Sequence, residues 1–212
     1  MTISEKHASR SKASSKAMLD AATDLLLEGG FAAATFVQIG KRAGYSRGLV
    51  TTRFGSKAGL LDALIDHIVI GWLDRTLKPM QAKDNGLEGA LVLLEGIWRQ
   101  VARDDRQLRA LYIMMFDSIT AEPALQARMA ELHEFLRSSI ADSLRRGVAD
   151  GSVKPDVDAD IEAALLLSTL RGVTYQWMLA PDRFDPVPAL KHVHATTADR
   201  IGATELATTK TG

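Results

Sequence analysis

The sequence contains no cysteine among its 212 residues. A chain without cysteine forms no disulfide, offers no thiolate nucleophile and provides no thiolate ligand for zinc. Long apolar runs are also missing: the longest candidate, from Ala163 to Leu170, ends at Arg171 and falls short of a membrane-spanning helix. Residues 1–16 are polar and basic and lack the apolar centre of a secretory signal. We therefore expect a soluble, cytoplasmic protein that makes no membrane contact.

The chain as a whole lacks an excess of either charge, because its 26 Lys and Arg balance 26 Asp and Glu. This balance disfavours a uniformly basic nucleic-acid protein. It conceals an asymmetry, because residues 1–57 carry a net charge of +5 and the remainder a net charge of −5. A cationic first quarter on an acidic body directs one face of the protein toward a polyanion.

The sequence shows no convincing alternating strand, no βαβ unit and no internal repeat, and its apolar residues recur at helical spacing. It predicts an all-α fold of about nine helices joined by short loops. The first helix is expected over Ser15–Glu28 and the fourth from Lys57 to about Leu77, ended by Pro79. Three divisions are expected: a disordered basic N-terminal arm over residues 1–13, a three-helix helix-turn-helix domain over 14–57, and a helical effector-binding and dimerisation domain over 58–205.

The stretch TFVQIGKRAGYSRGLVTTRFGSK, residues 35–57, supports the functional interpretation. Thr35 is placed to cap a helix with Phe36 and Ile39 on its apolar face, and Gly44 suits the left-handed conformation that ends it. Ser46 is placed to cap a second short helix. Two helices of about eight residues around a Gly-containing turn are typical of a helix-turn-helix.

The second of these helices is basic at both ends and has short side chains between, which suits a helix that lies in the DNA major groove. Its expected outward side chains are Arg47, Thr51, Thr52 and Arg53. Gly40 and Gly48 are expected to loosen the two helices, since glycine costs up to ~1 kcal/mol of helix propensity.

The helix expected over Ala159–Leu179 differs from the others, because from Ala163 to Leu179 it carries one charge and has apolar residues on every face. A helix that is apolar all round must be buried all round. We interpret it as a subunit interface, the alternative being a central core helix of a monomer. A dimer also suits paired recognition helices, which read half-sites about 34–36 Å apart. The expected interface residues are Leu165, Thr169, Gly172, Gln176, Leu190, Val193 and Thr197.

Two short motifs suggest other chemistry. Gly44, Ser46 and Gly48 fit the G-x-S-x-G nucleophile elbow of serine hydrolases, but that motif needs a buried strand before the serine, and the surrounding pattern is helical. His192 and His194 lie two positions apart, on different sides of a helix, so no metal site is expected. With no Walker or dinucleotide-binding loop present, we expect no enzymatic activity and no cofactor.

Aromatic, Met and charged residues in the C-terminal part are candidates for an effector pocket, although each is alternatively an ordinary core residue. Arg171 is the most informative, because a lone cation on an apolar helix must be paired or solvated. We favour a structural carboxylate as its partner, with an anionic ligand as the alternative. The candidate pocket residues are Trp98, Tyr112, Met115, Phe116, His133, Arg171 and Trp177.

The first 65 or so positions resemble the DNA-binding domain of the TetR family of transcriptional regulators. The resemblance depends on several short patterns: Gly29-Gly30-Phe31, Ala43-Gly44, Ser46-x-Gly48 and Phe54-Gly55-Ser56-Lys57. The C-terminal two-thirds is similar to the family in helix lengths and in details such as Gly172…Gln176-Trp177.

This resemblance implies an operator-binding homodimer, usually a repressor, that releases DNA when a small apolar or amphipathic effector binds the C-terminal domain. It implies phosphate contacts from Thr35 and Lys57. It also implies that Arg47, Gly48 and Leu49 face base edges. Where the family usually has aromatic residues or histidine, we expect shorter or charged contacts from Thr51, Thr52 and Arg53. The full set of expected DNA-contacting residues is Thr35, Phe36, Val37, Ser46, Arg47, Gly48, Leu49, Thr51, Thr52, Arg53 and Lys57.

The expected partners are therefore double-stranded DNA with a palindromic operator, a second copy of the chain and an unidentified small-molecule effector. The alternative is a constitutive dimeric DNA-binding protein with a filled C-terminal core and no effector.

Overall fold

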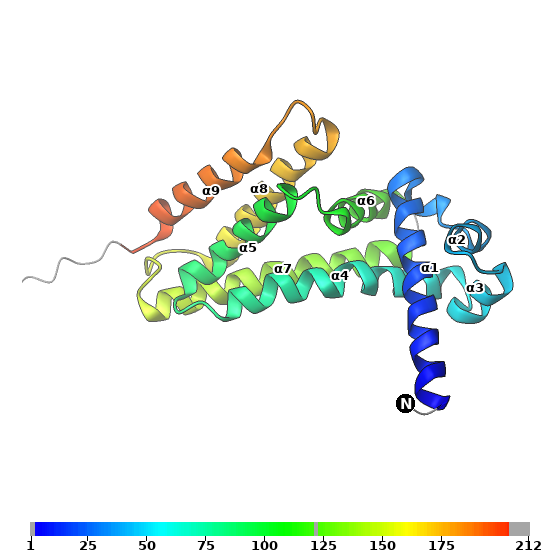
Figure 1. The fold of residues 1–212 in the computed structure, drawn as a ribbon. Coiled ribbons are helices and arrows are strands. Elements are labelled where there is room, and N and C mark those ends of the chain that lie inside the picture. Colours follow the sequence, from blue (N-terminus) through cyan, green and yellow to red (C-terminus); the bar gives the residue numbers. More distant parts are fainter. Residues whose placement is uncertain (1–2, 121–122, 204–212) are drawn as a thin grey trace, which may run out of the picture. The chain divides into compact units, whose positions relative to one another are not determined.

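The computed structural model describes residues 3–120 and 123–203, which form nine helices and no strand (Figure 1). The all-α prediction is confirmed. The helices are α1 (Ile3–Ala33), α2 (Phe36–Ala43), α3 (Arg47–Phe54), α4 (Lys57–Gln81), α5 (Gly86–Val101), α6 (Arg106–Thr120), α7 (Pro123–Asp150), α8 (Ala159–Leu179) and α9 (Pro186–Ile201).

The chain divides into two compact units. The first comprises Met1–Trp72 with Arg106–Ala130, and the second comprises Leu73–Asp105 with Glu131–Gly212. The first unit therefore extends beyond the expected boundary at residue 57 and also includes α6. Residues 204–205, the end of the expected second domain, lie outside the described residues.

The core of the first unit forms where α1 packs against α2 and α6, and α2 against α3. Met18, Ala22 and Leu26 recur at helical spacing along α1 and are fully buried. Ile39 of α2 and Val50 of α3 are fully buried as well. Because each short helix has an apolar face that is covered in this way, tertiary packing stabilises two helices that would be marginal in isolation.

A break near the end of α1 turns the chain toward α2. Gly29 and Gly30 leave helical geometry, as expected for the end of the first helix, and Gly30 has a φ of 70°, a conformation that favours glycine. Asp117 of α6 fixes this turn, because its carboxylate accepts the Phe31 N–H at 2.9 Å. A residue 86 positions away thus sets the direction in which the chain approaches Thr35.

The N-terminal arm differs from the expectation, because helix α1 begins at Ile3 rather than near Ser15. Apart from residues 1–2, which lie outside the described residues, the arm expected to be disordered is helical. Residues 3–14 lack Gly and Pro and include Glu, Lys, Arg and Ala, which extend a helix readily once the buried part of α1 has nucleated it.

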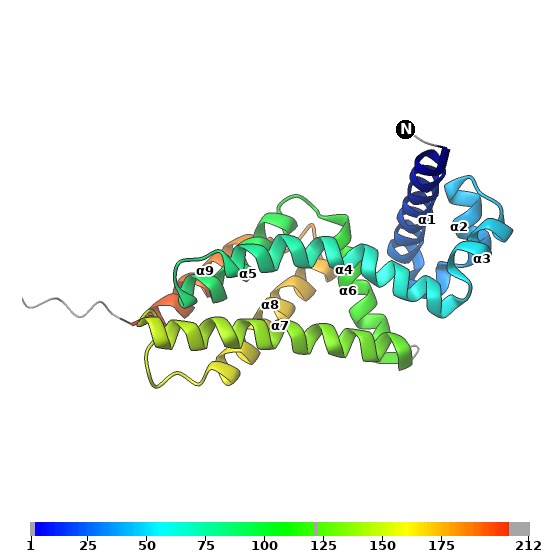
Figure 2. The same cartoon turned by 90° about the horizontal axis from the view of Figure 1, so that it is seen from below.

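The second unit is organised by α5, α8 and α9, with α9 packed against both of the others (Figures 1 and 2). Leu94 and Ile97 of α5 and Leu190 and Ile201 of α9 are buried at 0–1% exposure. At one end of this packing, Arg200 of α9 donates two hydrogen bonds to the Glu162 carboxylate of α8, at 2.5 and 2.6 Å.

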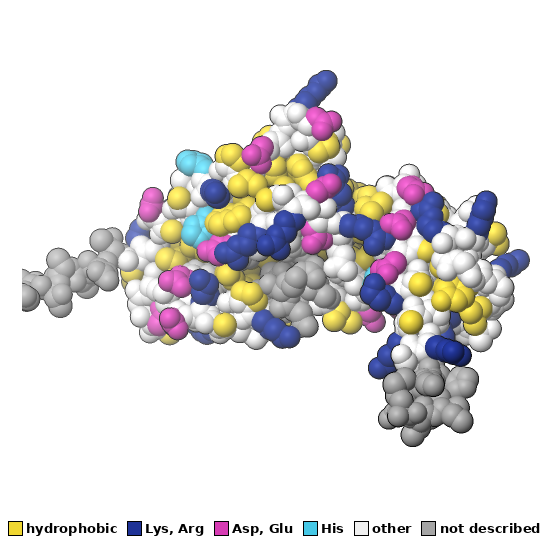
Figure 3. Space-filling view, in the orientation of Figure 1, with side chains coloured by type: hydrophobic (Ala, Val, Ile, Leu, Met, Phe, Trp, Pro, Cys, Tyr) yellow, Lys and Arg dark blue, Asp and Glu magenta, His cyan; other side chains and the backbone are white. Residues whose placement is uncertain are grey.

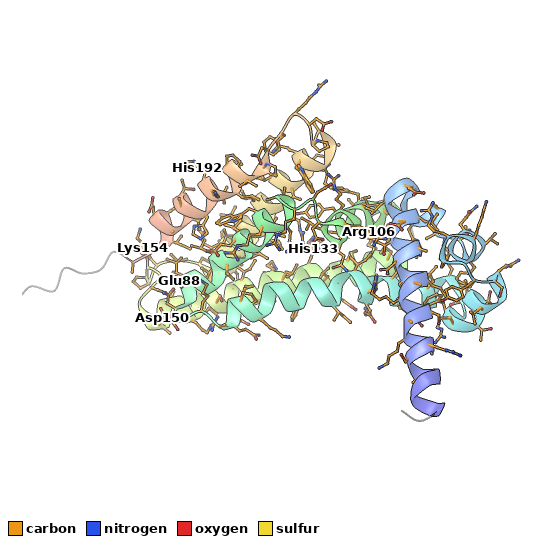
Figure 4. The ribbon with its side chains drawn as sticks, in the orientation of Figure 1. Glu88, Arg106, His133, Asp150, Lys154 and His192 are labelled. Atoms are coloured by element: carbon orange, nitrogen blue, oxygen red, sulfur yellow. The ribbon has the colours of Figure 1, made fainter. Side chains whose placement is uncertain are left out.

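The start of α5 is held by acceptors from two places in the second unit. Asn85 accepts the Glu88 N–H at 2.9 Å, and Asp150 at the end of α7 accepts the Gly86 N–H at 2.8 Å (Figure 4). Ser152 accepts the Leu87 N–H at 3.2 Å. Three of the N–H groups that a helix start leaves unpaired are thereby satisfied.

Proline limits the helices less than the sequence predicts. Helix α4 continues to Gln81, two residues past Pro79. Helix α9 also includes proline, since it starts at Pro186. The physical reason is position: in a last turn proline removes one hydrogen bond only, and in a first turn it removes none, since those N–H groups have no intrahelical partner.

Among the described residues, no helix has the length and apolarity needed to cross a bilayer.

Candidate nucleic-acid interface

The two short helices of the first unit begin and end as the sequence predicts. Thr35 caps α2, its hydroxyl accepting the Gln38 N–H at 3.2 Å. Gly44 ends α2 in the left-handed conformation, with a φ of 76°. Ser46 caps α3, its hydroxyl accepting the Leu49 N–H at 3.1 Å. The helix-turn-helix is therefore present, with both helices at the expected bounds.

The face of α3 opposite Val50 is exposed along its whole length. Arg47, Gly48, Leu49, Thr51 and Thr52 all lie at the surface. The two threonine hydroxyls donate to backbone carbonyls one turn earlier, Thr51 to Arg47 at 3.0 Å and Thr52 to Gly48 at 2.9 Å. Their oxygens still accept hydrogen bonds, while the Arg47 guanidinium is available as a donor to acceptors outside the chain.

A pocket of 420 Å³ adjoins the N-terminus of α2. It brings together five of the residues expected at DNA, from three separate places in the chain: Thr35, Phe36, Val37, Arg47 and Lys57. Ala32 and Ala34 complete its lining. The Lys57 ammonium group lies over the Phe31 ring, 5.2 Å from its centroid, which orients that cation beside the pocket.

The charges around this pocket favour the binding of an anion. Residues 29–61 include five Lys or Arg and no Asp or Glu. The first turn of α2 has no acidic residue, so its unpaired N–H groups and helix dipole add positive potential next to Arg47 and Lys57. Figure 3 shows Lys and Arg side chains projecting from the surface around α1, α2 and α3. A cleft with this chemistry suits the phosphates of a nucleic-acid backbone.

Two of the basic residues in this region are engaged within the protein. Arg42 donates two hydrogen bonds to the Glu28 carboxylate, at 2.7 and 2.8 Å, and this pairing raises the pKa of Arg42. Arg53, expected to point outward, is half-buried and donates to Ser11 at 2.6 Å and to Ser14 at 3.4 Å. The Arg53 guanidinium is thus directed at α1.

The two glycines expected to loosen the helices behave differently. Gly40 is buried, and a Cβ at this position would lie 2.7 Å from the Tyr45 carbonyl oxygen. Glycine at position 40 therefore permits the close approach of the turn, which corrects the expectation of a loose α2. At Gly48 a Cβ would meet only the Ser46 hydroxyl, at 3.8 Å, so α3 has room for a side chain there.

The competing motifs carry no catalytic or metal-binding geometry. Ser46 stands between two helices, and its hydroxyl is engaged as a cap, so the strand that a nucleophile elbow requires is missing. His194 lies 3.5 Å from Glu95 and edge-on to Trp98, while His192 is exposed on α9 (Figure 4). Within the described residues no three His, Cys, Asp or Glu side chains are grouped to hold a metal ion.

The expected dimer residues separate into two sets. Leu165, Thr169, Gly172 and Gln176 are exposed on α8, and Val193 is half-buried on α9. Leu190 and Thr197 are buried at 0% and 6% exposure in the second unit's own core, so their place at an interface stays a prediction. Their periodicity indicates an apolar face but not its partner, which here belongs to the same chain.

The expected pocket residues also separate. Tyr112, Met115 and Phe116 belong to the first unit, where the Tyr112 and Phe116 rings lie 6.3 Å apart. The second unit contains the remaining four. Its tryptophans differ, since Trp177 is buried and Trp98 half-buried against His194. His133 and Arg171 are half-buried.

Sequence reasoning missed three residues that shape the DNA-binding unit. Asp117 holds the turn at Phe31, and Ser11 and Ser14 hold Arg53. The glycine pair at the end of α1 signals a turn but not its carboxylate partner. The serines lie in a segment without apolar periodicity, where nothing indicates a contact with α3.

A helix-turn-helix with an exposed, acid-free recognition helix and a cationic cleft at its edge defines a DNA-binding protein. Comparison with known families agrees with this class. Residues 18–64 match the bacterial regulatory proteins of the tetR family, and residues 94–202 match the C-terminal domain of BetI-type transcriptional repressors.

Individual proteins of this kind are also similar. The HTH-type transcriptional regulator TtgR of Pseudomonas putida is 24% identical over 176 residues, 79% of this chain and 81% of that protein. The HTH-type transcriptional regulator UidR of Escherichia coli strain K12 is 25% identical over 156 residues, 74% of this chain and 77% of that protein.

Solved structures share the fold. A SmeT–triclosan complex superposes with a TM-score of 0.79 at 22% identity, covering 91% of this chain and 93% of that one. A regulator from Saccharomonospora viridis in complex with choline has a TM-score of 0.77 at 18% identity, covering 91% of this chain and all of that one.

The chain belongs to the TetR family. It is a DNA-binding transcriptional regulator and not an enzyme, in agreement with the sequence analysis.

Proposed function

We propose that the protein is a homodimeric repressor that binds a palindromic operator and is released from it by a small organic effector. The observation that supports a dimer is a stripe of exposed apolar side chains on α8. Ile161, Leu165, Tyr175 and Leu179 are exposed at 58%, 51%, 42% and 66%. Steps of three or four residues connect them through exposed Thr169, Gly172 and Gln176, so one face of α8 offers apolar surface over roughly 27 Å.

An apolar stripe of this length on a soluble protein supports association with another protein surface. Its self-complementarity favours a second copy of the chain, because small Gly172 lets two α8 helices approach closely across a two-fold axis. A two-fold dimer presents two α3 helices in opposite orientations. Such a pair fits a palindrome whose half-sites are about one helical turn apart.

The roles of repressor and effector rest on the relatives. The C-terminal match is to BetI-type transcriptional repressors. SmeT is the repressor of the Stenotrophomonas maltophilia multidrug efflux pump SmeDEF, and its complex contains triclosan, while the Saccharomonospora viridis regulator was solved with choline. For this chain we propose a small apolar or amphipathic effector, with Trp98, His133, Arg171 and Trp177 among its contacts.

The test begins with an operator selected by the protein from a random-sequence duplex library. Sedimentation of the complex should give two chains per duplex, and the selected sequences should form a palindrome. One chain per duplex, or an asymmetric site, would contradict the dimer.

Effector release is tested separately, by adding triclosan, choline and a panel of small amphiphiles to the complex while fluorescence anisotropy is followed. An effector present at a hundredfold excess over its Kd should stabilise the free protein by about 2.7 kcal/mol and weaken operator binding. If no compound changes either quantity, the constitutive dimeric binder is the better account.

A further inference from the structure

The N-terminal end of α1 is joined to the recognition helix, although these segments are about 40 residues apart in sequence. Arg53 of α3 donates one guanidinium N–H to the Ser11 hydroxyl at 2.6 Å and another to the Ser14 hydroxyl at 3.4 Å. Ser14 in turn donates to the Ser11 carbonyl at 3.0 Å, which leaves its oxygen available to Arg53. Ser14 is only 9% exposed, and Ser11 and Arg53 are half-buried.

This junction fixes the direction of the segment before it, which we call the α1 extension, residues 3–14. The α1 extension is about 18 Å long at 1.5 Å per residue. In Figure 1, α1 runs beside α2 and α3 and continues past them. That length matches about five phosphates along one DNA strand, at 3.4 Å each.

The described side chains of the α1 extension have the chemistry of a phosphate-contacting surface. Arg10 and Lys12 flank the anchoring Ser11, so they lie on either side of the helix face that contacts α3, and both are exposed. Ala8 and Ser9 before these cations and Ala13 after them are exposed and small, which lets a helix approach another surface closely. Lys16 is excluded, because its ammonium group pairs with Asp20 at 2.7 Å.

We infer that the α1 extension is a second DNA-contacting surface, in which Arg10 and Lys12 bind backbone phosphates beside the half-site that α3 reads. DNA is the favoured polyanion because the anchor belongs to α3 itself: when α3 lies in the major groove, the phosphates bordering that groove are the anions nearest to the extension. Arg53 then acts as a positioning residue that orients two other cations, in place of the direct DNA contact expected from the sequence.

The test compares the full-length protein with the variant R10Q/K12Q on the selected operator duplex. Two lost phosphate contacts should reduce the slope of log Kobs against log salt by roughly 1.8, at about 0.9 per phosphate. Hydroxyl-radical footprinting should show sugars beside the half-site protected by the wild type and exposed with the variant. The matched control R103Q/R183Q removes two exposed arginines of the second unit and should leave slope and footprint unchanged.

A second variant tests the anchor without changing net charge. S11A/S14A removes both acceptors of Arg53 and should lose the same flanking protection, with helicity checked by circular dichroism. The inference is overturned if R10Q/K12Q keeps the wild-type footprint and slope, or if S11A/S14A protects the flanking sugars fully. Absence of any footprint with the wild-type protein would instead count against operator binding itself.

Discussion

Replacing Leu165 with arginine should dissociate the proposed dimer. Leu165 lies about one helical turn from the start of the exposed α8 stripe and is 51% exposed in the single chain. Complete burial of a leucine side chain is worth about 1.5–3 kcal/mol, so covering the exposed half stabilises the dimer by roughly 0.8–1.5 kcal/mol per protomer. Each substitution occurs twice in a symmetric dimer, which doubles the loss to about 1.5–3 kcal/mol.

The introduced guanidinium adds to this loss, because an unpaired charge in an apolar interface costs more than the missing contact. A total of at least ~3 kcal/mol raises the dimer Kd by about a hundredfold or more, at 1.4 kcal/mol per factor of ten. Sedimentation equilibrium over a range of concentrations measures this change directly. Operator affinity should fall in parallel, because a monomer binds only one half-site.

The matched control is I119R, which places the same cation on α6 of the first unit, where Ile119 is 73% exposed. This variant should remain dimeric. If L165R keeps the wild-type dimer Kd, the α8 stripe is not the subunit interface. If both variants dissociate equally, general charge repulsion and not local burial explains the effect.

Two other predictions concern stability. G48A should stabilise the protein by up to ~1 kcal/mol in thermal unfolding, because the added Cβ meets only the Ser46 hydroxyl, at 3.8 Å. The same substitution should weaken operator binding, because position 48 is expected to face DNA. Unchanged binding would show that position 48 does not contact DNA. The second prediction concerns Asp150, whose pKa is lowered below 3.8 by hydrogen bonds from the Ser152 hydroxyl and N–H and from the Gly86 N–H. The ionised Asp150 carboxylate therefore stabilises the fold at pH values above its unfolded pKa. This stabilisation is lost as the pH falls through the folded pKa. D150N should therefore unfold more easily than wild type at pH 7, and this difference should shrink in acid; a constant difference across pH would contradict that pairing.

The sequence predicts the helix-turn-helix closely because its signals are local. The helix ends are set by the caps Thr35 and Ser46 and by the left-handed residue Gly44, which interact with N–H and C=O groups within one turn. Interactions this close in sequence can be predicted from neighbouring residues. The helix α8 is equally well bounded, with Asp158 as its cap and Leu179 at its end.

Contacts between distant segments were not predictable in the same way. The link between Arg53 and Ser11 spans 42 positions, and nothing in the local pattern distinguishes an arginine directed at DNA from one directed at α1. Leu190 illustrates a related limit: its spacing correctly indicates an apolar face, but whether another chain or α5 covers that face depends on the tertiary arrangement.

Gly40 shows that helix propensity alone does not explain why glycine occupies a position. Helix propensity describes a glycine there as a weakness, whereas the Tyr45 carbonyl oxygen leaves no room for a Cβ. The close approach of a turn is a property of the folded unit, so it becomes visible only once the two helices are placed together.

The measurement that most directly tests sequence-specific binding through α3 is the affinity of R47A for the selected operator and for a random duplex of equal length. Arg47 is exposed at the first position of α3, beside the cationic cleft. If it donates to base edges, its loss should cost about 1–3 kcal/mol on the operator and little on random DNA. The matched control K41A removes an exposed cation from α2 and should leave the operator preference unchanged. Equal weakening of R47A on both duplexes would contradict base reading and make Arg47 a phosphate contact.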